Sequence, residues 1–265
     1  PADSTKWNST PHNAKGALDE LASRVKTIET GGGGGSSIVY HKWDVFAPPV
    51  SPSAADDEFS DATFNTSKWS IYDPGANSVA ASEDDQGLLL SGDGDANEWN
   101  GVYQSLPSGN FSISTYVMGY SITENNSQFG LALFENGSVG SSGLAYLGFL
   151  SGVDSYIVSQ THANYNDVSP TQLSYATWSG TGVFLRIRRN GTTFYGEFSN
   201  DGQSWFNHPS SFTLGYVPTH MGLVFRRNTS TSNYRLRSRF FRYINSDVDL
   251  YAPINGRSIA VLTSG

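Results

Sequence analysis

The sequence contains no cysteine, which excludes both a disulfide framework and a cysteine nucleophile. Only 15% of its 265 residues are charged, against about 25% in an average soluble protein. No apolar run reaches the roughly 18 residues of a membrane-spanning helix, so membrane insertion is not expected. The net charge of −8 argues against general nucleic-acid binding, which calls for a basic surface.

The few charges are also segregated along the chain. Lysine and arginine are absent from residues 69–185, a stretch that holds 11 acidic residues. Residues 186–242 then hold nine arginines and only two carboxylates, Glu197 and Asp201. Arginines that alternate along a strand, such as Arg235 and Arg237, share one face. Two interpretations stay open: rows of arginine on the outside of a sheet that pair with carboxylates of the acidic stretch 69–185, or a cationic groove for an acidic polysaccharide.

Glycine and aromatic residues are abundant, with 28 glycines and 13% aromatic residues. Through residues 56–245, short apolar runs recur every eight to twelve residues and are separated by turn signals, which predicts an all-β domain. Asn190-Gly191 predicts a type I′ turn with both residues at its centre. A two-sheet sandwich is the natural way to bury such strands.

The two ends of the chain differ from this domain. Residues 1–30 carry apolar residues at heptad spacing, which predicts a short coiled-coil helix; a lone amphipathic helix is the alternative. Residues 31–55 are a glycine-rich linker and extended segment. Residues 246–265 have the pattern of a C-terminal β-hairpin. The predicted oligomerisation positions are Leu18, Leu21, Val25 and Ile28.

Several motifs in residues 56–245 resemble concanavalin A-like (laminin-G-like) jelly-roll domains, which are attached to glycosidases and adhesins. They are an opening Asp-x-Phe-x-Asp motif followed by Trp69, the strand with Arg186 and Arg188, and a Ser-x-Asp-Gly-x-Ser-Trp hairpin that ends at Trp205. The resemblance implies a concanavalin A-like sandwich with Trp69, Trp178 and Trp205 at core positions.

Together with the predicted helical foot and the glycine run, the whole chain resembles the distal part of a tailed-phage fibre or capsid spike. That resemblance implies a homotrimer on the virion surface, outside the cell. The partners that it implies are other virion subunits and a glycan or polysaccharide of the host surface. A purely structural virion protein and a glycan-cleaving enzyme are the alternatives.

The candidate chemistry is binding rather than catalysis. Glucanases of this fold carry Glu-x-Asp-x-x-Glu on one strand, and the chain lacks that run; a carboxylate pair assembled only by folding stays open. Asp56, Asp57, Glu58 and Asp61 are expected to form a solvated turn instead. Aromatic residues beside amides suit the stacking of sugar rings, although packing on their own sheet is the alternative. The predicted glycan-binding residues are Trp99, Asn100, Tyr103, Tyr165, Asn166 and Asp167.

One loop offers oxygen ligands at alternate positions, as calcium loops do: Asp93, Asp95 and Asn97. It lacks the glycine and the final glutamate of the helix-loop-helix version, and a polar hairpin loop is the alternative. A structural Ca²⁺ is therefore the one cofactor considered.

Overall fold

The described part of the chain forms two antiparallel β-sheets, so the predicted all-β sandwich is confirmed. The structure is a computed structural model. It describes residues 52–75, 78–92, 98–120, 127–136, 143–150, 156–164, 172–178, 182–202, 204–209, 211–226 and 234–245. The predicted coiled-coil helix and C-terminal hairpin lie outside these ranges. Among the described residues, no helix is long and apolar enough to span a membrane.

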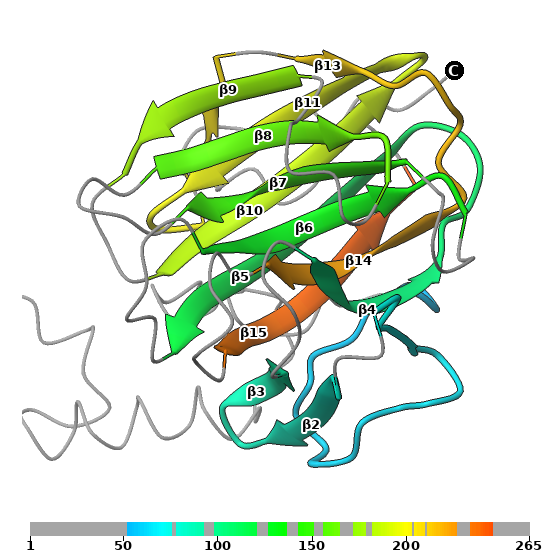
Figure 1. Cartoon of the computed structure of the whole chain (residues 1–265), viewed down its shortest axis with the longest axis vertical. Helices are drawn as coiled ribbons and strands as arrows, with labels where there is room; N and C mark the ends of the chain where they lie inside the picture. The colour runs from blue at the N-terminus through cyan, green and yellow to red at the C-terminus, as the bar shows by residue number, and fades with distance from the viewer. Residues whose placement is uncertain are drawn as a thin grey trace, which may run out of the picture. The chain divides into compact units, whose positions relative to one another are not determined.

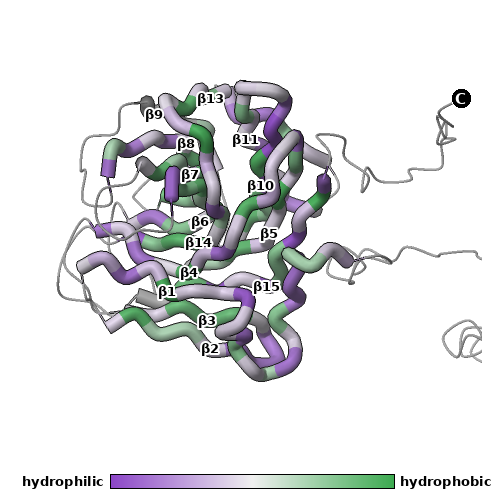
Figure 2. The backbone as a smooth tube through the Cα atoms, turned by 90° about the vertical axis from the view of Figure 1, so that its right-hand side faces the viewer, coloured by the Kyte–Doolittle hydropathy of each residue, from purple (hydrophilic) through white to green (hydrophobic). Residues whose placement is uncertain are grey.

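The two sheets face each other as separate layers, as Figures 1 and 2 show. The seven-stranded sheet consists, in spatial order, of β1 (Ser70–Tyr72), β4 (Trp99–Ser105), β14 (His220–Arg226), β6 (Gln128–Phe134), β7 (Leu144–Leu150), β8 (Tyr156–His162) and β9 (Gln172–Thr177). The eight-stranded sheet consists of β12 (Phe206–Asn207), β11 (Thr193–Ser199), β10 (Gly182–Asn190), β5 (Phe111–Tyr120), β15 (Tyr234–Ile244), β3 (Gly87–Gly92) and β2 (Ala80–Asp84), with β13 (Phe212–Thr213) also paired with β11.

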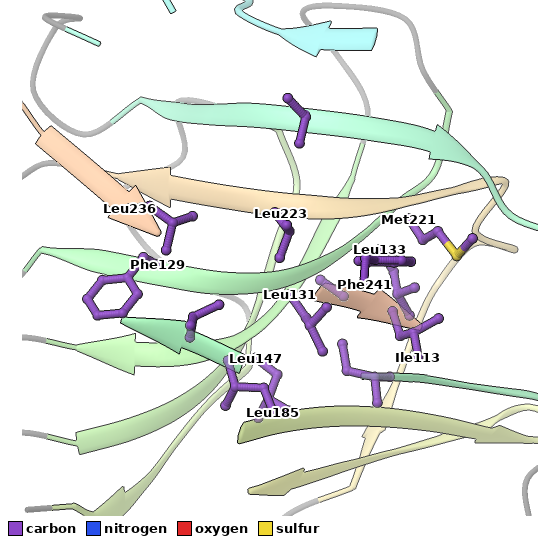
Figure 3. Close-up of a cluster of buried hydrophobic side chains, with 14 of the residues drawn as sticks. Ile113, Phe129, Leu131, Leu133, Leu147, Leu185, Met221, Leu223, Leu236 and Phe241 are labelled. Carbon is purple, nitrogen blue, oxygen red and sulfur yellow. The ribbon is translucent and has the colours of Figure 1, made fainter. Parts of the chain in front are cut away.

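The main core lies between the layers, where side chains of both sheets interdigitate (Figure 3). Its members include Leu131, Leu147 and Leu223 of one sheet and Ile113, Leu185 and Leu236 of the other. Strands β6 and β7 are buried along their whole length on both faces, which explains their nearly continuous apolar sequences. The second face of these strands therefore packs against something other than the opposite sheet.

The opening acidic motif fastens the entry segment to strand β15. Asp57 accepts a hydrogen bond of 2.8 Å from the Trp69 indole and pairs through its backbone with Phe241. Trp69 is fully buried, and Phe241 packs edge-on against it at 5.1 Å. Asp56 accepts a 2.6 Å bond from the Tyr243 amide and is itself buried. The prediction of a solvated turn was therefore wrong for Asp56, whose carboxylate satisfies backbone donors inside the protein.

The turn after β10 lies one residue further along the chain than its sequence suggested. Asn190 still pairs with Thr193, so the two-residue loop is Gly191-Thr192 rather than Asn190-Gly191. Gly191 has a φ of 60°, and Asn190 and Thr192 are not among the residues with positive φ. A two-residue loop with glycine at its first position is typical of a type II′ turn. The predicted hairpin is confirmed, and its type I′ turn is corrected.

Candidate functional site

The seven-stranded sheet curls around the face that it turns away from the other sheet, which we call the concave face. Trp99 on β4 and His162 on β8 are four strands apart. That separation corresponds to about 19 Å across a flat sheet. Their ring centroids are nevertheless 5.2 Å apart. The sheet must therefore be strongly curved. The curvature brings side chains of strands on its two sides, such as β4 and β8, into contact over the concave face.

A second apolar cluster fills the concave face; it includes Tyr72, Trp99, Phe134, Tyr146, Val158 and Val224. Beneath it, Gly101, Gly130 and Gly148 lie in one row across β4, β6 and β7. The Tyr146 ring lies over Gly148, where a Cβ would overlap its hydroxyl, and Trp99 packs on Tyr146 at 4.6 Å. Because these glycines have no side chains, the rings of Trp99 and Tyr146 can lie flat on the sheet.

One end of the concave face is polar and buried. The strand register places Trp99, Arg226 and Gln128 side by side on β4, β14 and β6, and all three are more than nine-tenths buried. The Arg226 guanidinium lies 5.6 Å from the Trp99 ring centre. Among the described residues, neither Trp99 Nε1 nor Gln128 Oε1 has a hydrogen-bond partner. Hydroxyl groups, which both donate and accept, would satisfy this donor and this acceptor.

The other end of the concave face is accessible to solvent and aromatic. Tyr103 and His220 are both half-buried, and their rings meet edge-on at 5.3 Å. Tyr103 also meets Tyr72 edge-on at 6.2 Å. Burial lowers the pKa of His220 below its ordinary value of 6.5, so its ring is neutral at pH 7. This end therefore presents an uncharged aromatic surface, about 13 Å along β4 from Trp99.

The predicted glycan-binding residues are distributed differently from what their spacing suggested. Trp99 and Asn100 lie within strand β4 rather than in an exposed loop, which corrects that expectation. Strand alternation turns Asn100 to the core side, opposite Trp99 and Tyr103, and its side chain donates to the Glu98 carbonyl. Tyr103 lies on the concave face at its accessible end, and its glycan contact stays a prediction.

The remaining predicted site residues lie outside the described ranges: Tyr165, Asn166 and Asp167 for glycan, and Asp93, Asp95 and Asn97 for Ca²⁺. Within the described ranges, no cluster of three or more histidine or carboxylate side chains is arranged to hold a metal ion. Sequence reasoning missed His220 and Tyr146 on the concave face.

The concave face has the chemistry of a binding surface. Along its described strands, the alternating positions that face outward carry aromatic, aliphatic, amide, histidine, serine and glycine residues and one arginine, and none is Asp or Glu. Glycoside hydrolysis generally requires two carboxylates that flank the bond. The described part of this face therefore offers a ligand accessible rings at the end with Tyr103 and His220, but it does not itself supply that pair.

Solved structures with the same fold include carbohydrate-active proteins. A GH43 protein, BlXynB, from Bacillus licheniformis matches with a TM-score of 0.57 at 15% identity, over 75% of this chain and 40% of its own. A xylan β-1,4-xylosidase from Bacillus halodurans C-125 gives a TM-score of 0.55 at 14% identity, over 74% and 40% of the two chains.

A third structure, Bacteroides ovatus xyloglucan PUL GH43B, gives a TM-score of 0.52 at 11% identity over the same shares, 74% and 40%. The chain thus spans about 40% of the length of these proteins. No protein-family model matches the chain, and no curated protein is similar to it in sequence. At these identities the likeness is one of fold.

Proposed function

We propose that the chain binds a carbohydrate along the concave face of the seven-stranded sheet. The observation that carries the proposal is the pair of buried polar atoms, Trp99 Nε1 and Gln128 Oε1, that have no partner among the described residues. Leaving such groups unpaired costs about 1–3 kcal/mol each, and a ligand rich in hydroxyl groups removes that cost. Arg226 lies between them in the register, and its guanidinium is 5.6 Å from the Trp99 ring centre.

The accessible end supports the same proposal. Binding sites for small ligands combine aromatic walls with a few polar groups that fix the orientation of the ligand. The half-buried Tyr103 and the neutral His220 supply an aromatic wall on which the C–H face of a sugar ring can stack. The distance of about 13 Å from Tyr103 to Trp99 suits an oligosaccharide better than a single sugar.

Glycan cleavage is the second candidate function. The named activity of a structural neighbour, a xylan β-1,4-xylosidase, favours it. The absence of Asp and Glu from the described positions of the concave face favours binding instead. Release of reducing ends from a xylo-oligosaccharide by the purified chain would replace the binding proposal with this one.

Replacing Tyr103 with Ala is expected to weaken the binding of a neutral oligosaccharide about tenfold, because a stacked aromatic contact contributes on the order of 1 kcal/mol. A glycan array first selects the oligosaccharide, with xylohexaose as one of its probes, and calorimetry then measures the affinity. Tyr195→Ala is the matched control, since Tyr195 is also part-exposed but belongs to the other sheet. Equal affinities of Tyr103→Ala and the unaltered chain would contradict the assignment.

We further propose that the chain is the receptor-binding end of a trimeric fibre or spike on a virion surface, with other virion subunits as partners. The support is the heptad pattern of residues 1–30 and the resemblance of the whole sequence to phage fibres. Three copies would multiply a weak glycan affinity into avidity. A structural Ca²⁺ held by residues 93–97 belongs to the same proposal. A virion protein that makes only protein contacts is the alternative.

Light scattering of the full chain is expected to give three times the 28.7 kDa of a single copy. Deleting residues 1–30 should then yield monomers, because the heptad positions would hold the helices together. A monomeric mass for the full chain would contradict the trimer. A trimer that survives the deletion would place the subunit contacts elsewhere.

A further inference from the structure

A chain of hydrogen bonds fixes the His220 side chain at the accessible end of the concave face. The Thr219 amide donates to the Phe134 carbonyl at 3.0 Å, and the Leu106 amide donates to the Thr219 carbonyl at 2.8 Å. Thr219 is thus held between the ends of β4 and β6. Its side-chain oxygen, Oγ1, lies 2.8 Å from the carbonyl oxygen of Glu135 and 2.9 Å from Nδ1 of His220.

These two contacts of Oγ1 determine which ring nitrogen of His220 carries the proton. A carbonyl oxygen can only accept, so the single hydroxyl proton of Thr219 points to Glu135. Towards Nδ1, Oγ1 then presents a lone pair, and Nδ1 must be the donor. A neutral imidazole carries one proton on its two nitrogens, and burial keeps the pKa of His220 below its ordinary value. At pH 7 the other nitrogen, Nε2, is therefore an acceptor.

Nε2 of His220 receives no hydrogen bond from the part of the chain that the structure describes. Ser105, which is exposed, lies directly opposite His220 on β4 but does not bond to this nitrogen. The Tyr103 ring meets the His220 ring edge-on at 5.3 Å, with 78° between their planes. An accessible aromatic ring and an acceptor of fixed orientation thus lie next to each other.

We propose that His220 Nε2 accepts a hydrogen bond from a hydroxyl group of the sugar that stacks on Tyr103. This role rests on the proposed binding of a carbohydrate to the concave face, and it makes His220 more than an aromatic wall. Because Thr219 fixes the tautomer and the ring before the ligand arrives, little side-chain freedom is lost on binding. Such a site discriminates against a sugar whose hydroxyl is missing or methylated at that place, since the acceptor then stays unpaired.

The same acceptor favours a neutral sugar over an acidic one. A ligand carboxylate offers only lone pairs, which repel the lone pair of Nε2. The Glu135 carboxylate accepts a hydrogen bond of 3.0 Å from the Gly143 amide, and Glu135 contacts the Thr219 hydroxyl through its backbone carbonyl. Neither His220 nor Glu135 supplies the cation that an acidic sugar requires.

The arginines on the outward face of the eight-stranded sheet, which could have formed a cationic groove, meet carboxylates instead. The pairs are Arg186 and Arg188 with Glu197, Arg237 with Asp84, and Arg242 with Glu58. A β-bulge shifts the alternation of β15, so Arg242 joins Arg237 on this face. The interpretation as paired arginine rows is therefore confirmed for these positions, although only Asp84 among these carboxylates belongs to the acidic stretch 69–185.

NMR of the full chain with ¹⁵N-labelled histidine tests the tautomer without any ligand. The chain has five histidines, and His220→Phe identifies the signal of His220. At pH 7 we expect the chemical shift of a protonated nitrogen at Nδ1 and that of an unprotonated nitrogen at Nε2. Thr219→Val removes the hydroxyl that holds Nδ1 and should mix the two tautomers. Ser105→Ala is the matched control, because it removes the hydroxyl opposite His220 and should leave the tautomer as it is.

Calorimetry tests the contact with the ligand, which is chosen from an array of neutral oligosaccharides that includes xylohexaose. His220→Phe keeps an aromatic ring and should weaken binding about tenfold, because it removes one hydrogen bond. His220→Gln keeps an acceptor and should weaken binding less.

Two results would overturn the role of His220 while carbohydrate binding still stands. One is a protonated Nε2 in the unaltered chain, and the other is equal affinity of His220→Phe and the unaltered chain. If no neutral oligosaccharide binds, the role of His220 falls together with the function on which it rests.

Discussion

Replacing Glu197 with Gln is expected to lower the free energy of unfolding by about 3 kcal/mol or more. The substitution keeps the shape of the side chain and removes its charge. It leaves the guanidiniums of Arg186 and Arg188 facing each other without the carboxylate between them, and Arg186 is buried. Removing one partner of a buried ion pair costs more than the pair contributes, because the remaining charge stays desolvated.

Asp84→Asn provides the comparison for this variant. It removes an acceptor of Arg237 on the same outward face of the sheet, but the Asp84 side chain is 45% exposed. Only one guanidinium then loses its carboxylate, and water reaches the Asp84 side of the pair, so the loss of stability should be smaller even though the Arg237 side chain is only 8% exposed. Urea unfolding followed by tryptophan fluorescence measures both variants. Equal losses for Glu197→Gln and Asp84→Asn would show that the shared carboxylate has no special role.

The second large effect is expected from Gly148→Ala, which should lower the free energy of unfolding by about 3 kcal/mol. A Cβ at this position would overlap the Tyr146 hydroxyl and the backbone oxygen of Phe129. The Tyr146 ring could move, but the Phe129 carbonyl belongs to the neighbouring strand β6 and cannot. Because Trp99 packs on Tyr146, the substitution should also disturb the buried end of the concave face.

Gly215→Ala is the matched control, since a Cβ there meets no atom within 4 Å and Gly215 has no positive φ. It should change stability by a few tenths of a kcal/mol at most. Thermal unfolding of the two alanine variants makes the comparison. If Gly148→Ala unfolds at the same temperature as Gly215→Ala, the close packing of rings over the glycine row is refuted.

The features of the fold that local patterns determine could be predicted from the sequence. Alternation and turn residues located the strands, and the resemblance to concanavalin A-like domains implied a core position for Trp69, which is fully buried. The exact loop after β10 was missed, because a one-residue difference between Asn190-Gly191 and Gly191-Thr192 depends on which ladder hydrogen bonds form. Local propensity does not decide that choice.

The candidate site was less predictable, because it depends on how one sheet curves. Trp99 stands beside polar residues in the sequence, which suggested an exposed loop. In the structure, residues of distant strands bury it, including Tyr146 and His162, which are 47 and 63 residues further along the chain. No local sequence pattern indicates the sheet curvature that brings these three side chains together. Tyr103 shares the concave face with Trp99, four positions earlier, because side chains alternate between the two faces of a strand.

The ion pairs of the arginines were likewise only partly predictable from the sequence. Their concentration in residues 186–242 predicted rows on a sheet face, and the alternation of Arg186 and Arg188 placed both on one side. The bulge in β15 could not be foreseen, so the inclusion of Arg242 in that face was not predicted. The partner Glu58 comes from the entry segment, far from the acidic stretch that the charge pattern pointed to.

The binding of a neutral glycan to the concave face is tested most directly by ¹⁹F NMR of the full chain labelled with 5-fluorotryptophan. The six tryptophans give separate reporters, and Trp99→Phe and Trp205→Phe assign two of them. On titration with the neutral oligosaccharide that binds the array most strongly, the Trp99 signal should shift and saturate, while that of Trp205, whose ring packs against Arg186 of the other sheet, stays unchanged. A saturating shift of Trp205 with an unmoved Trp99 would contradict the concave face as the glycan site.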